Sequence, residues 1–132
     1  MKIAKGIELL NEIVGDGPGA GRGDRVTYNA RFFLRRGDEV TQDGEMLSRA
    51  RAHCTSRLVD GVELIDHVTK LGKRQSIAGV EKSLYGMRVG GYREVLVSPH
   101  LAYGSKGVPG RVPADALLRI QLWLRDVSRS SQ

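Results

Sequence analysis

Apolar and polar side chains alternate along four stretches of the chain, which is the pattern of half-buried β-strands. The alternation is clearest over residues 26–34 and 117–127, and it is weaker over residues 6–14 and 92–97. The turn residues at 36–38 predict that residues 39–40 return as a hairpin partner of the first clear strand. In the last strand the side chains expected to face the core are Leu118, Ile120, Leu122 and Leu124.

The segment between residues 41 and 71 is less regular. Arginines on alternate positions around residue 50 fit a strand, but four apolar residues could equally share one face of a helix, so both interpretations stay open. Asp60-Gly61 predicts a second turn, and residues 62–71 are expected to be extended. The four apolar residues are Leu47, Ala50, Cys54 and Leu58.

The period changes after Ser76, where apolar side chains begin to recur at helical spacing. We expect Ser76 to cap the N-terminus of a short helix and glycines from residue 86 onward to end it. Strands that surround one short helix predict an α+β fold, with an antiparallel sheet wrapped on that helix. The apolar helix positions are Ile77, Val80, Leu84 and Met87.

Residues 98–113 contain three of the four prolines and three glycines. Proline fixes the backbone and lacks an N–H donor, so this stretch is neither a regular helix nor a central strand. A loop stiffened in this way loses less entropy when it becomes ordered. It presents one aromatic hydroxyl, Tyr103, between two small residues, and we expect it to form the wall of a binding pocket.

The chain length fits one domain, residues 1–132, with a core of its own. The single cysteine, Cys54, excludes an intrachain disulfide, and no signal-peptide or bilayer-spanning run is present, so we expect a cytoplasmic protein with no membrane partner. Cys54 itself is expected to be a buried or half-buried thiol.

The net charge of +6 comes from scattered arginines that do not interleave with aromatic residues. Nucleic-acid binding is therefore disfavoured.

Three further features are weak. Gly15-x-Gly17-x-x-Ala20 fits a loose dinucleotide fingerprint, but a proline interrupts it and a strand follows where a helix is required. The three histidines and Cys54 show no ligand spacing, so we predict no metal site. Trp123, on the outward face of the last strand, is expected to be covered by residues 41–57 or by another subunit.

Several short motifs follow one another in the second half of the chain: the segment from Gly79 to Gly90, then Val95-Leu-Val-Ser-Pro99, Ala102-Tyr-Gly104, Gly107-Val-Pro-Gly110 and Val112-Pro113. Together with the closing strand, they resemble the FK506-binding proteins, which are peptidyl-prolyl cis–trans isomerases. The match covers residues 72–127 without a gap. The first half matches more loosely, with an insertion at about residues 41–60, and we expect a divergent, bacterial-like member.

The resemblance implies a half-barrel of antiparallel strands around the helix, with a hydrophobic pocket that holds a proline ring. By match to the family's motifs, the Tyr103 hydroxyl would donate to one substrate carbonyl and the Ile77 backbone N–H to another. Isomerisation makes and breaks no covalent bond, so no cofactor or metal is needed. The remaining predicted substrate-binding residues are Ser76, Val80, Ala102, Val108, Val112, Ile120 and Asp66.

The pocket departs from the family pattern in its aromatic residues. Val80 stands where most members have a tryptophan floor, and Ile120 stands where an inward aromatic is expected. Both changes imply a wider, aliphatic slot with less ring stacking.

The first half permits two alignments, which stay open. One places Ala30 at a pocket tyrosine and Val40-Thr41 at a Phe-Asp pair. The other places Leu64-Ile65 at that pair, with Asp66 one residue late. Asp66 is a pocket acid or, as we favour, an exposed carboxylate on a strand.

Two functions from different classes follow. The first is an isomerase that acts on Xaa-Pro bonds of peptides or unfolded chains and assists their folding. The second is a catalytically weak or silent module that docks a protein partner through the same pocket and the insertion at 41–60. RNA binding by the basic surface is a weaker third hypothesis.

Overall fold

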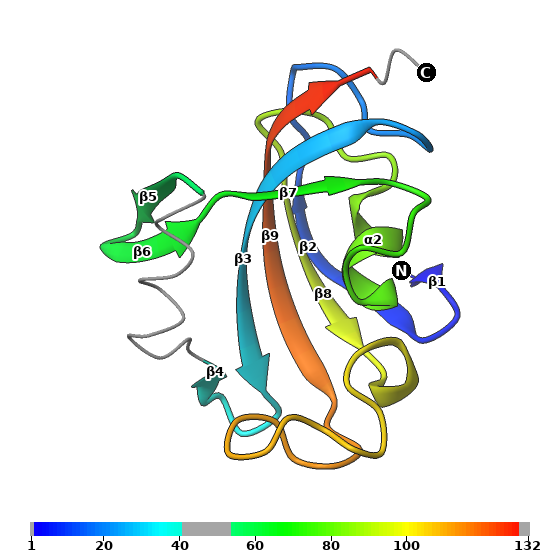
Figure 1. The fold of residues 1–132 in the computed structure, drawn as a ribbon, viewed down its shortest axis with the longest axis vertical. Coiled ribbons are helices and arrows are strands. Elements are labelled where there is room, and N and C mark those ends of the chain that lie inside the picture. Colours follow the sequence, from blue (N-terminus) through cyan, green and yellow to red (C-terminus); the bar gives the residue numbers. More distant parts are fainter. Residues whose placement is uncertain (1, 41–53, 130–132) are drawn as a thin grey trace.

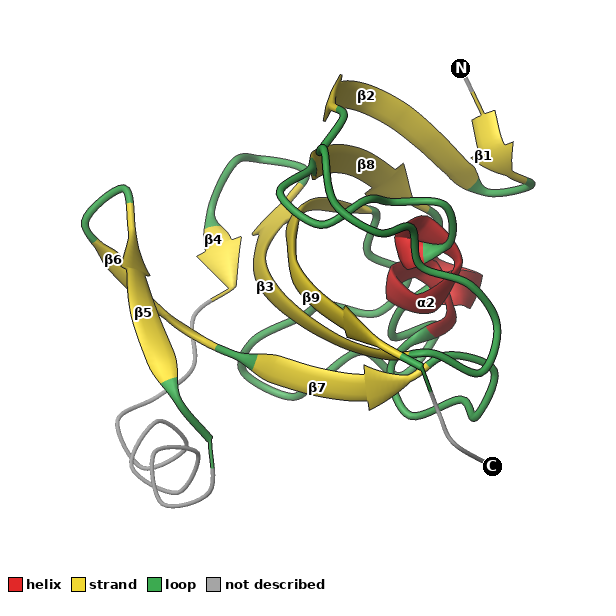
Figure 2. Cartoon of the chain, turned by 90° about the horizontal axis from the view of Figure 1, so that it is seen from above, coloured by secondary structure: helices red, strands yellow, loops and turns green. Residues whose placement is uncertain are grey.

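The structure, a computed structural model, describes residues 2–40 and 54–129. Within them an antiparallel sheet of seven strands curves around one helix, and a separate two-stranded hairpin lies to the side away from that helix (Figures 1 and 2). This confirms the predicted α+β fold. The elements are β1 (Lys2–Ala4), β2 (Ile7–Ile13), β3 (Arg25–Leu34), β4 (Glu39–Val40), β5 (Ser56–Val59), β6 (Val62–Ile65), β7 (His67–Lys70), α2 (Ala78–Leu84), β8 (Tyr92–Val97), the 3₁₀ turn η1 (Pro99–Leu101) and β9 (Leu118–Ser128).

Strand β3 organises the sheet. One of its edges pairs with β9, from Arg25 opposite Ser128 to Leu34 opposite Leu118. Its other edge pairs first with β7 and then with β4, and beyond β9 the order continues through β8 and β2 to β1. The four strands predicted by alternation correspond to β2, β3, β8 and β9, and the predicted hairpin to β4.

The core lies between the curved sheet and α2. The four inward side chains predicted for β9 are all completely buried, and on the helix Val80 and Leu84 are buried against them. Full burial of such a side chain contributes roughly 1.5–3 kcal/mol, so this helix–sheet contact stabilises the fold. The outward Trp123 contacts the ring of Tyr92, with 5.2 Å between the ring centroids.

The helix confirms the predicted period but not its predicted cap. Ile77 occupies the N-cap position, and no side chain caps the first turn. Because α2 begins one residue later than expected, the hydroxyl of Ser76 lies outside the position from which it could accept an amide of that turn. The predicted Ser76 cap is therefore wrong.

The segment that the sequence left open is only partly described. Residues 56–59 form strand β5, which pairs with β6, so the strand alternative is confirmed there. The predicted extended stretch at 62–71 consists of β6 and β7, with Asp66 between them. Residues 41–53, which make up most of the predicted insertion, lie outside the described residues, and the single-domain boundaries with that insertion stay a prediction.

Gly79 is a position of close approach between α2 and β8. A Cβ atom on Gly79 would lie 2.4 Å from Cγ1 of the fully buried Val97. We expect Gly79→Ala to lower the free energy of unfolding by about 1–2 kcal/mol in urea denaturation, since overpacking outweighs the better helix propensity of alanine. Gly19→Ala is the control, because its Cβ would meet no atom closer than 3.9 Å. An equal loss in both variants would contradict this account.

Candidate functional site

The proline-rich loop holds Tyr103 in place through its own backbone. The 3₁₀ turn closes when the amides of Ala102 and Gly104 both donate to the Pro99 carbonyl, at 2.9 and 2.8 Å, and the Gly107 amide donates to the Tyr103 carbonyl at 3.0 Å. Tyr103 is half-buried against the core, and burial raises the pKa of its hydroxyl. The phenol therefore stays protonated at neutral pH and can donate a hydrogen bond.

Ile77 supplies a second candidate donor. Its carbonyl accepts the amides of Val80 and Glu81 at 3.0 and 3.1 Å, which starts the helix. Its own N–H precedes the helix, and no acceptor for it is found among the described residues. Amides at a helix start have no partner within the helix, so this N–H can bind an external carbonyl.

Most of the predicted pocket residues belong to a single hydrophobic cluster. Val80, Val112 and Ile120 are buried within it, and the others pack against it half-buried. The chain thus brings together residues from α2, the proline-rich loop and β9, although these segments are separated in sequence. The half-buried members among the predicted residues are Ile77, Ala102, Tyr103 and Val108.

Tyr28, which belongs to the alternating stretch at residues 26–34, reaches the same region. It is buried on β3, and its pKa rises to about 12 because burial and the nearby Tyr103 outweigh the hydrogen-bonding effect of Ser76. The Ser76 Oγ is itself buried, and it has no hydrogen-bond partner of good geometry in the described part of the chain. The available signal was a single aromatic hydroxyl among the inward apolar positions of β3, a type of side chain that needs a polar partner when buried.

The floor of the site is aliphatic. Val80 is 1% exposed, and Ile120 is completely buried opposite Phe32 of β3 and Val95 of β8. Both side chains therefore belong to the core. The aromatic side chains of the same cluster come from other positions, namely Tyr28, Phe32, Tyr85 and Tyr103.

Asp66 lies between β6 and β7, where its side chain is buried. It is 5% exposed, so the favoured interpretation as an exposed carboxylate is wrong. Its oxygens accept hydrogen bonds from Asn29 Nδ2 and Arg57 Nε, both at 2.8 Å, and from Thr55 Oγ1 at 2.6 Å. Burial alone would raise its pKa, but these bonds outweigh burial and lower the pKa to about 2. The carboxylate is fully engaged in holding the β5–β6 hairpin against β3.

An apolar groove lies between that hairpin and β3–β4. Its volume is about 330 Å³. His67, at one side, contacts the ring of Tyr28 with 5.3 Å between centroids, so the groove adjoins the candidate site. Burial lowers the pKa of His67 and Asp66 opposes this in part. The other lining residues are Ala30, Arg31, Phe32, Glu39, Val40, Val62, Glu63, Leu64 and Ile65.

Other sequence candidates have no role in this site. Cys54 is exposed, so the expected buried or half-buried thiol is wrong: the residue lies in the irregular stretch before β5 and not on an inward strand face. In the part of the chain that the structure describes, no three metal-ligating side chains gather around one point. No helix within residues 2–40 and 54–129 is long and apolar enough to cross a bilayer.

Comparison with known protein families shows to which family the chain belongs. A family model described as FKBP-type peptidyl-prolyl cis-trans isomerase matches residues 17–124. The chain belongs to the FKBP family. It contains an FKBP-type peptidyl-prolyl cis–trans isomerase domain, as the motifs between residues 79 and 113 indicated.

Relatives of this FKBP domain are eukaryotic. The chain is 39% identical over 85 residues to peptidyl-prolyl cis-trans isomerase FKBP11 of Bos taurus, covering 60% of this chain and 42% of that protein. It is 35% identical over 95 residues to FK506-binding protein 2 of Candida glabrata, covering 66% and 68%, and 31% identical over 121 residues to bovine FKBP9, covering 86% and 21%. The chain thus spans less than half the length of the two bovine relatives. None of the three supports the bacterial-like character expected from the sequence.

Proposed function

We propose that this FKBP domain catalyses cis–trans isomerisation of Xaa-Pro bonds in peptides or unfolded polypeptides. The proposal rests on one arrangement, in which Tyr103 and Ile77, the residues that carry the two candidate donors, pack against a single hydrophobic cluster. The barrier to rotation is roughly 18–20 kcal/mol because amide resonance must be broken. No nucleophile is required, since no covalent bond changes.

Such a site accelerates the reaction by binding the twisted transition state more tightly than either planar isomer. A twisted amide has lost its conjugation, so an apolar, water-poor cavity can bind it better than either planar isomer. Donors fixed at the helix start and on the stiff loop would hold the flanking carbonyls and orient the rotating bond. Every 1.36 kcal/mol gained at the twisted state raises the rate about tenfold.

The test is the isomerisation rate of a proline tetrapeptide, measured by a protease-coupled assay or by NMR exchange. We expect the domain to exceed the uncatalysed rate in proportion to its concentration. A rate equal to that of the peptide alone would exclude the enzyme and leave the binding module.

The second candidate is a protein-binding module with little or no catalysis. The buried aliphatic floor of Val80 and Ile120 favours it, because an aromatic floor would add ring contacts worth roughly 0.5–1.5 kcal/mol each. In that case proline peptides should bind the domain without faster isomerisation. A role in protein folding, a partner docked through residues 41–60 and a cytoplasmic location stay predictions.

A further inference from the structure

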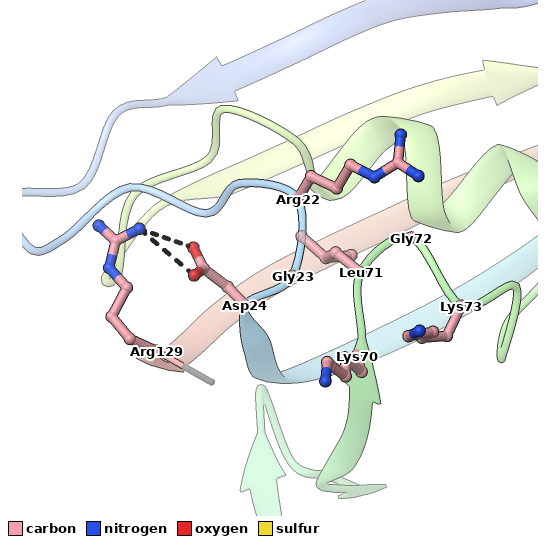
Figure 3. Close-up of a pocket in the computed structure, with 8 residues that line it drawn as sticks. All are labelled: Arg22, Gly23, Asp24, Lys70, Leu71, Gly72, Lys73 and Arg129. Atoms are coloured by element: carbon pink, nitrogen blue, oxygen red, sulfur yellow. Dashed lines mark hydrogen bonds and ion pairs between the residues drawn. The ribbon is translucent and has the colours of Figure 1, made fainter. Parts of the chain in front are cut away.

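A basic pocket of about 400 Å³ lies where the start of β3, the end of β7 and the end of β9 meet (Figure 3). Four cationic side chains from three separate segments line it, together with one carboxylate. None of its lining residues is aromatic. The residues are Arg22, Gly23, Asp24, Lys70, Leu71, Gly72, Lys73 and Arg129.

The one carboxylate is already used by the protein. Asp24 is 3% exposed; its Oδ2 accepts the Gly21 amide at 2.9 Å, and Arg129 Nη1 lies 3.2 and 3.3 Å from its two oxygens (Figure 3). Its charge is therefore offset by Arg129. Among the described residues no ion pair is found for Arg22 or Lys73. The pocket keeps an excess of positive charge, which attracts anions.

The backbone around these cations is fixed. The Gly23 amide donates to the Leu71 carbonyl and the Leu71 amide to the Asp24 carbonyl, both at 2.9 Å. The stem of Arg22 passes over Gly72, where an added Cβ would lie 3.2 Å from Arg22 Cγ. The backbone positions from which these side chains extend are therefore fixed before a ligand binds, which lowers the cost of ordering the site.

The pocket continues toward the candidate proline site. An adjoining cavity of about 780 Å³ shares Arg22 and Gly72 with it and reaches Ser76 at the start of the helix. Arg74 and Lys82 add positive charge there, and Glu81 adds one carboxylate. The five residue steps from Gly72 to Ile77 span at most roughly 18 Å, a distance that an extended peptide of comparable length can cross.

We propose that this basic pocket binds an anionic side chain, phosphoserine or a carboxylate, on a polypeptide whose proline occupies the site at Tyr103 and Ile77. Only the placement of the proline at Tyr103 and Ile77 rests on the proposed function; the anion-binding part does not. No aromatic side chain lines the basic pocket itself, so it offers no surface on which a base could stack, which favours a peptide over a nucleic acid. Guanidinium groups bind phosphate and carboxylate oxygens through paired hydrogen bonds.

The experiment is fluorescence anisotropy with labelled peptides that carry one proline and, about four residues away, phosphoserine, aspartate or serine. We expect the phosphoserine peptide to bind roughly tenfold more tightly than the serine peptide at low salt, with aspartate between them. Arg22→Gln/Lys73→Gln should abolish this preference. Lys5→Gln/Arg88→Gln, which removes the same charge from exposed positions outside the pocket, should keep it.

Three results would overturn the proposal: no preference for the anionic peptides, an equal loss in the control variant, or tighter binding of a single-stranded oligonucleotide that the Arg22/Lys73 variant abolishes. A phosphoserine peptide with alanine in place of proline separates the two proposals. If the domain does not accelerate isomerisation but still binds the alanine-containing phosphoserine peptide more tightly than the matching serine peptide, the anion site stands without the enzyme. If isomerisation is measured and the preference is absent, only the anion site fails.

Discussion

The double variant Tyr103→Phe/Ile77→Pro is expected to lose about 100-fold in kcat/KM for a proline tetrapeptide while it folds like the wild type. Each change removes one donor: the hydroxyl from Tyr103 and the N–H from Ile77. A hydrogen bond contributes roughly 0.5–1.5 kcal/mol, and 1.36 kcal/mol corresponds to about tenfold in rate. Each single variant should therefore lose up to about tenfold.

Proline fits the backbone at Ile77. The φ angle there is −59°, close to the roughly −65° that proline imposes, and the N–H that it removes has no acceptor among the described residues. Ile77→Ala is the matched control, because it removes the side-chain contacts and keeps the N–H. Circular dichroism melts should show similar folding for Ile77→Pro and Ile77→Ala. Unchanged kcat/KM in a folded double variant would remove both donors from the mechanism.

The sequence predicted those elements whose signal is local. Strand β9 has four inward side chains at every second position, and burial on one face is what selects that pattern. The helix shows its apolar spacing in the same way, and the prolines around Tyr103 exclude regular structure there. These signals need no knowledge of the rest of the chain.

The parts that were missed depend on partners far away in the chain. Asp66 was expected to be exposed because a charged side chain on a strand usually faces solvent, whereas Asn29 of β3 binds its buried carboxylate. Tyr28 could be placed on an inward face, but not next to Tyr103. Ser76 failed as a cap for a different reason, since periodicity alone does not fix the first residue of a helix.

The basic pocket illustrates the same limit. The basic residues appeared scattered because Arg22, Lys73 and Arg129 are far apart in the sequence. Backbone hydrogen bonds between residues 23–24 and Leu71 bring two of these segments together. The ion pair of Arg129 with Asp24 adds the third.

Asp66→Ala is expected to lower the free energy of unfolding by about 3 kcal/mol, because it removes three hydrogen bonds to a buried carboxylate that contribute about 1 kcal/mol each. The carboxylate links Thr55 and Arg57 of the hairpin segment to Asn29 of β3. Asn29 Oδ1 in turn accepts a hydrogen bond from Arg125 Nε at 2.7 Å, so the network extends to β9. Urea denaturation measures the loss. Asp38→Asn is the control, because its exposed ion pair with Arg36 contributes at most about 1 kcal/mol.

The same carboxylate gives the fold a pH dependence with a defined sign. Its pKa is lowered from the ordinary value of 3.8 to about 2, so the charged form is favoured in the folded state. The stabilisation is fully present above about pH 4 and is lost as pH falls through about 2, because the unfolded chain then binds the proton first. Asp66→Asn has no such proton to bind, and its free energy of unfolding should fall less steeply than that of the wild type between pH 4 and 2. If the free energies of unfolding of the wild type, Asp66→Asn and Asp38→Asn all fell equally steeply between pH 4 and 2, the Asp66 network would not hold the hairpin.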